Sequence, residues 1–119
     1  MRAAALAGGW LCAAAIVWLS LSPSPPDPGV EYGDKLGHVA AYALLMFWFG
    51  YLYRRSQVRI AYALVWIALG VALEFAQAAT SYRSFELADM AANALGVLFG
   101  ALAALSLPTA AAAGGKEKP

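Results

Sequence analysis

Four long apolar stretches, separated by short polar segments, limit what this chain can fold into. They cover residues 3–21, 36–53, 60–79 and 87–107. A bilayer core about 30 Å thick is crossed by roughly 20 apolar helical residues, so each stretch approaches the length of a membrane span. The chain has 119 residues, is 62% hydrophobic and has a mean hydropathy of +0.63, too apolar for a soluble domain of this size. We predict an all-α integral membrane bundle of four transmembrane helices.

The segments between these stretches are short. Residues 22–34 are rich in Pro and Ser, which removes backbone donors and ends the first helix. Residues 54–59 and 80–86 can only form tight hairpin connections. We therefore predict one four-helix domain over residues 1–107, followed by a disordered cytoplasmic tail at 108–119 that is low in sequence complexity.

The basic residues predict the orientation of the chain. In a four-span arrangement only Lys35 and Arg83 fall on one side, and the other side collects Arg2, Arg54, Arg55, Arg59, Lys116 and Lys118. Basic residues accumulate on the cytoplasmic side of membrane proteins, so we expect both termini inside the cell. The formal net charge of +1 gives no reason to expect a nucleic-acid partner.

The first apolar stretch has a second interpretation as a secretory signal peptide, because it has a basic start and contains Ala13-Ala14-Ala15. We favour a retained helix, since the stretch is long for a signal peptide and no clear cleavage motif precedes the prolines. The single cysteine, Cys12, excludes an internal disulfide and a Cys/His zinc motif.

Polar residues recur at helical spacing in the second stretch. Asp34, His38 and Tyr42 are four residues apart and share one helix face at 3.6 residues per turn. Glu74 and Gln77 share a face near the end of the third stretch, and Asp89 and Asn93 share one near the start of the fourth. In an antiparallel bundle these positions lie at the same end, which we place at the outer leaflet.

Carboxylates that face lipid are costly, so these side chains should face one another inside the bundle. Asn93 is followed at the same spacing by Gly96 and Gly100, a pattern of small residues that lets another helix approach closely. We assign these two glycines to helix packing.

Ionisable residues inside membrane spans are candidates for function. His38 is a candidate general base or proton relay, with Glu74 and Asp89 as its acid/base partners. The alternative for each is a hydrogen-bonded packing contact between helices. Binding roles are predicted for Asp34, Lys35, Tyr42, Gln77, Arg83 and Asn93. Lys35 and Arg83 would hold an anion. We expect no metal and no other cofactor, because one imidazole and two carboxylates are an unselective ligand set.

The order and spacing of these residues resemble the VanZ-like membrane protein family. The resemblance covers residues 34–100 and rests on Asp34-Lys35-x-x-His38-x-x-x-Tyr42, Glu74-x-x-Gln77, Arg83-Ser84-Phe85 and Asp89-x-x-x-Asn93-x-x-Gly96-x-x-x-Gly100. It implies a bacterial cytoplasmic-membrane protein, in a family named for a member that raises tolerance to the glycopeptide antibiotic teicoplanin.

Two functional hypotheses follow from the sequence. Neither of them establishes whether the protein is an enzyme. In the first, an outward-facing polar pocket binds or acts on an anionic lipid-linked group, such as a cell-wall precursor. In the second, the polar residues hold the bundle together and the protein is an accessory to a larger membrane partner. A weaker third hypothesis is a proton-linked transporter, which four helices could form only as a homo-oligomer.

Overall fold

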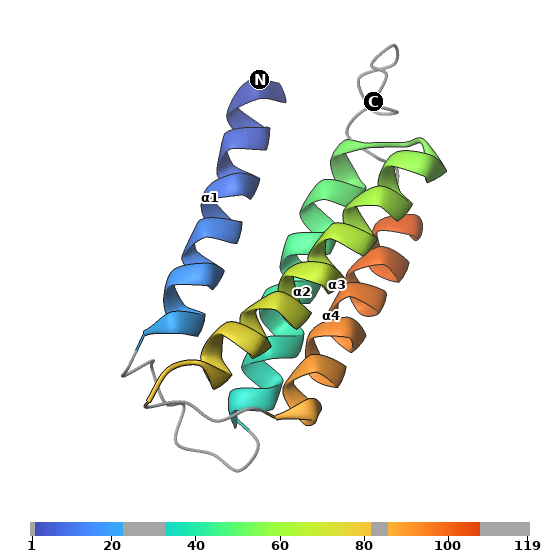
Figure 1. The fold of residues 1–119 in the computed structure, drawn as a ribbon. Coiled ribbons are helices and arrows are strands. Elements are labelled where there is room, and N and C mark those ends of the chain that lie inside the picture. The colour runs from blue at the N-terminus through green and yellow to red at the C-terminus, as the bar shows by residue number, and fades with distance from the viewer. Residues whose placement is uncertain (1, 23–32, 82–85, 108–119) are drawn as a thin grey trace.

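Four helices in antiparallel order make up the fold of the computed structural model (Figure 1). The structure describes residues 2–22, 33–81 and 86–107. The helices are α1 (Arg2–Leu21), α2 (Gly33–Leu52), α3 (Ser56–Ala78) and α4 (Leu87–Leu105). α1 and α3 end at the end of the bundle where α2 and α4 begin (Figure 1). The predicted tail at 108–119 and the Pro-rich residues 23–32 lie outside the described residues.

α2 and α4 make the closest helix contact, and two glycines of α4 permit it. A Cβ atom added at Gly96 would collide with the backbone oxygen of Val39, and one added at Gly100 would collide with that of Ala43. Both neighbours are backbone atoms of α2, which cannot rotate away as a side chain can. The small-residue spacing in α4 therefore lies directly against α2.

Aromatic side chains fill the space between α1, α2 and α3. Phe49 of α2 and Trp66 of α3 are almost fully buried, and their ring centroids lie 5.2 Å apart. Trp10 of α1 contacts both, at 5.5 Å and 5.3 Å between ring centroids. α1 approaches α2 closely at Gly9, where an added Cβ would lie 2.6 Å from Phe49. α1 thus contributes to the core as well as extending along the bundle.

Two arginines satisfy carbonyl groups at the end of α2 and at Tyr53, the residue that follows it, where no partner within the helix is available. Arg59 donates from Nε to the backbone oxygens of Gly50, at 3.0 Å, and Tyr53, at 2.7 Å. Arg2 donates from Nη1 to the oxygen of Leu52 at 3.1 Å, and its guanidinium lies 4.6 Å from the centre of the Tyr53 ring. Positive charge at a helix C-terminus is favourable.

The prediction of four transmembrane helices is confirmed in part. The described chain is helical without strands, and α1, α3 and α4 are long and apolar enough to cross a membrane. α2 has 20 residues and is long enough, but it is not apolar enough to count as a candidate span. Its lower hydropathy has a structural reason: Lys35 and His38 reduce it, and α2 can carry them because it contacts each of the other three helices.

Candidate functional site

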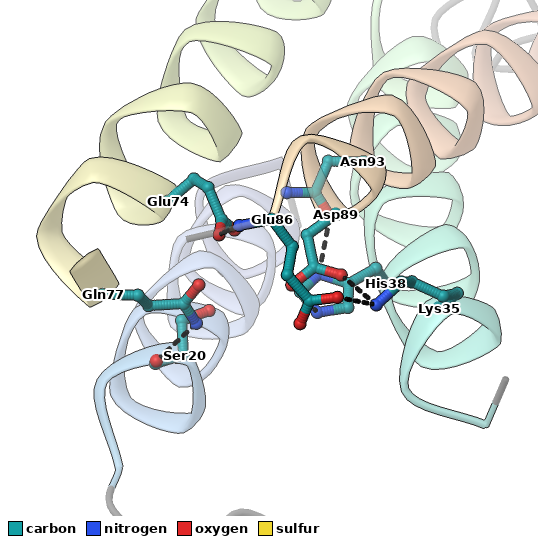
Figure 2. A network of polar contacts seen from close by, with 8 residues as sticks. All are labelled: Ser20, Lys35, His38, Glu74, Gln77, Glu86, Asp89 and Asn93. Carbon is teal, nitrogen blue, oxygen red and sulfur yellow. Dashed lines mark hydrogen bonds and ion pairs between the residues drawn. The ribbon is translucent and has the colours of Figure 1, made fainter. Parts of the chain in front are cut away.

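A group of charged and polar side chains lies where α2 and α4 begin and α3 ends (Figure 2). At its centre, the Lys35 ammonium lies 2.8 Å from Oε1 of Glu86 and 2.8 Å from Oδ1 of Asp89. The Asp89 side chain is 7% exposed, whereas that of Glu86 is 45% exposed. One cation therefore bridges a buried carboxylate and a partly solvated one. We call Lys35, His38, Glu86, Asp89 and Asn93 the Lys35 cluster.

His38 joins this cluster through both ring nitrogens. Nδ1 lies 2.8 Å from Oδ1 of Asn93, and Nε2 lies 3.8 Å from Oδ2 of Asp89. An amide oxygen can only accept, so this hydrogen bond assigns a proton to Nδ1. A separation of 3.8 Å is too long for a hydrogen bond. With the proton on Nδ1, Nε2 and Oδ2 are both acceptors, so a group with two donor hydrogens, such as a water molecule or an amine, could bridge them.

Glu74 of α3 lies beside this group and is 1% exposed. Its Oε2 accepts a hydrogen bond from the backbone N–H of Glu86 at 2.6 Å. Glu86 is the residue before α4 begins, and its own side chain makes no capping hydrogen bond. The carboxylate of α3 therefore serves the free N–H at the start of α4, where negative charge is favourable.

Gln77, one turn beyond Glu74, connects a different pair of helices. Its Nε2 donates to the backbone oxygen of Ser20 at 2.7 Å, and its side chain is buried (Figure 2). This contact ties the end of α3 to the last turn of α1, away from Lys35. Gln77 is therefore an interhelical link, next to the cluster and not within it.

The Tyr42 hydroxyl is a buried polar group of this region that lacks a hydrogen bond with the described part of the chain. Tyr42 is 2% exposed, and among the described residues its hydroxyl has no hydrogen-bond partner. It lies within electrostatic range of Glu74. A buried hydroxyl without a partner costs free energy, so a bound group or ordered water that accepts from it would be stabilising.

The chemistry open to this arrangement is proton transfer and hydrogen bonding. An imidazole next to a carboxylate is a common general base. Within the described ranges, no group of three His, Cys, Asp or Glu side chains could hold a metal ion.

The carboxylates outnumber the cations at this end of the bundle. Among the described residues there, Glu74, Glu86 and Asp89 are acidic, and Lys35 carries the one ammonium group. A ligand anion must therefore compete with a carboxylate of the protein for this cation.

The structure brings together Lys35, His38, Asp89 and Asn93, with Glu74 adjacent. Arg83 and the side chain of Asp34 lie outside the described part of the chain. Sequence reasoning missed Glu86 as a member of the site. The available signal was its spacing, since Glu86 and Asp89 are three residues apart and such pairs project to one side of a helix start.

The chain matches the family model described as VanZ/LLP1 over residues 9–108. This range includes all of α2, α3 and α4 and the greater part of α1. Neither the curated proteins nor the solved structures contain a match to the chain.

Proposed function

Because the chain belongs to the VanZ/LLP1 family, we propose that it is a multi-pass protein of the bacterial cytoplasmic membrane whose Lys35 cluster binds or acts on an anionic lipid-linked or cell-envelope group. In this proposal all four helices cross the membrane, with both termini in the cytoplasm. The charge distribution supports it: Arg2, Arg54, Arg55 and Arg59 lie at the end of the bundle opposite Lys35. The cluster then faces outward.

The double ion pair of Lys35 is the observation on which the proposal rests. Glu86 is the more exposed of its two carboxylate partners, and its backbone N–H is held separately by Glu74. The Glu86 side chain can therefore swing away while the start of α4 stays in place. A phosphate or carboxylate of the ligand would replace it on Lys35 and come to lie next to Asp89 and His38.

Proton transfer is the chemistry assigned to the acid/base groups if a reaction follows binding. Nε2 of His38 is the base, Asn93 orients the imidazole through Nδ1, Asp89 stabilises the protonated imidazole by its charge, and Glu74 is the nearby second carboxyl group. The remaining predicted residues are assigned to binding: Asp34, Lys35, Tyr42, Gln77, Arg83 and Asn93. Of these, Tyr42 contributes a buried hydroxyl donor, and Asn93 fixes the tautomer of His38.

Binding of a polyprenyl phosphate in detergent, followed by native mass spectrometry, tests this proposal. Lys35→Ala should abolish binding, because it removes the only cation described at this end. Glu86→Gln should bind more tightly, because the competing carboxylate is gone. Lys118→Gln is the matched control, since it removes one positive charge from a residue with no assigned role in binding. Equal binding by Lys35→Ala and the native protein, or weaker binding by Glu86→Gln, would refute the proposal.

The second candidate is an accessory protein in which the polar residues only join helices. It is favoured by the bond from Glu86 N–H to Glu74 and by that from Gln77 to Ser20, each of which connects two different helices. Intramembrane hydrogen bonds average about 0.6 kcal/mol, so their effect would be collective. In this case His38→Ala should reduce stability and teicoplanin tolerance of cells together. A stable His38→Ala protein with altered tolerance would exclude the accessory role.

A further inference from the structure

The end of the bundle opposite the Lys35 cluster contains an apolar cavity between α2, α3 and α4. Its volume is about 230 Å³, and it is lined by Met46, Gly50, Ser56, Arg59, Ile60, Ala101, Ala104 and Leu105. Apart from Ser56 and Arg59, the lining has no polar side chain. A drug-sized ligand usually occupies roughly 300–1,000 Å³, so this cavity suits a narrow hydrocarbon segment better than a bulky polar group.

The cavity is accessible from the outer surface of the bundle. Ile60 of α3 is 58% exposed and Leu105 of α4 is 63% exposed, so the cavity edge continues into the apolar surface of these helices. Its inner wall lies where α2 and α4 meet, because a Cβ added at Gly50 would lie 2.8 Å from the Cβ of Ala104. An apolar chain could therefore enter from the side without separating the helices.

One arginine lines this cavity, and two more, Arg54 and Arg55, directly precede the lining residue Ser56 in the chain. Arg59 lines the cavity, and the two hydrogen bonds of its Nε hold the guanidinium in place, while its terminal nitrogens make no hydrogen bond or ion pair with the described residues. Arg54 and Arg55 are exposed, and their guanidinium groups have no hydrogen bond or ion pair within the described ranges. The acidic side chains that the structure describes, Glu74, Glu86 and Asp89, all lie at the opposite end of the bundle.

We propose that this cavity and the three arginines form a binding site for an anionic glycerophospholipid. One acyl chain occupies the cavity, and the headgroup phosphate lies on Arg59, with Arg54 and Arg55 beside it. The two parts of the site match the two parts of the lipid in polarity and charge. Basic pockets between transmembrane helices are known to select anionic headgroups in this manner. The site is separate from the Lys35 cluster and does not depend on its function.

Photo-crosslinking with phosphatidylglycerol that has a diazirine in its acyl chain tests this inference on the full chain in neutral detergent. Labelling should concentrate on Met46, Ile60 and Leu105. Phosphatidylcholine with the same diazirine chain, used at the same concentration as phosphatidylglycerol, should not label these residues. Each basic residue near an anionic surface contributes roughly fivefold to affinity. The half-labelling concentration should therefore rise roughly 25-fold in the Arg54→Gln/Arg55→Gln protein, which loses no internal contact.

Lys35→Ala is the matched control and should label like the native protein. Labelling that falls in Lys35→Ala but not in the double arginine variant would place the lipid at the other end and overturn the inference. Equal labelling by phosphatidylcholine would also overturn it, as would label spread evenly over exposed apolar residues of α1 such as Leu11 and Trp18.

Discussion

Replacing Gly100 with alanine should push α2 and α4 apart. The added Cβ would lie 2.9 Å from the backbone nitrogen of Phe47, about half an ångström less than the closest ordinary contact of 3.4 Å, and would collide with the oxygen of Ala43. Overpacking a tight contact costs about 1–3 kcal/mol. The better helix propensity of alanine returns about 1 kcal/mol. Because the obstacles are backbone atoms, we expect a net loss of about 1–2 kcal/mol.

Gly37 provides the matched control for this prediction. It also lies in the interior of a helix, but a Cβ added there has no neighbour within 4 Å. Gly37→Ala should therefore leave the free energy of unfolding unchanged or raise it by about 0.4–1 kcal/mol. Both variants can be measured by titration with a denaturing detergent in mixed micelles. If Gly100→Ala were as stable as Gly37→Ala, the close contact of α2 with α4 would be wrong.

Three further predictions concern the polar end. Since His38 is the only histidine, its ¹⁵N signals should show a proton on Nδ1, and Asn93→Leu should remove that preference; an unchanged tautomer would refute the hydrogen bond. Glu74→Ala should cost about 1–3 kcal/mol of unfolding free energy, and Glu74→Gln, which keeps an acceptor, much less; equal losses would contradict the bond to Glu86. Gln77→Leu should cost about 0.6 kcal/mol and expose α1 to protease; unchanged cleavage would argue against the Ser20 contact.

The positions of the helices could be predicted from the sequence because each corresponds to an uninterrupted apolar stretch. The predicted third stretch began at residue 60, whereas α3 begins at Ser56. The difference arises because hydropathy excludes Arg59, although this residue belongs to the helix and turns its side chain toward the end of α2. Hydropathy reports which residues tolerate lipid, and helix ends are fixed by hydrogen bonds that it does not detect.

The candidate site could be predicted only as far as helix periodicity reaches. Spacing placed His38, Asp89 and Asn93 on faces at one end of the bundle, but it could not show that Asn93 contacts Nδ1 and Asp89 faces Nε2. Nor could it show that Lys35 has two carboxylate partners of unequal exposure. These details depend on how far α4 is rotated and shifted against α2, which follows from the packing at the glycines.

The modest hydropathy of α2 has a consequence for how the protein is made. A helix with Lys35 and His38 near its start partitions poorly into lipid on its own, whereas α1, α3 and α4 are apolar enough to do so. The partner that contacts α2 most extensively is α4, which leaves the ribosome last. In the proposed topology with four spans, we therefore expect α2 to stay near the insertion machinery during translation, and to enter the bilayer as a stable element only when α4 arrives.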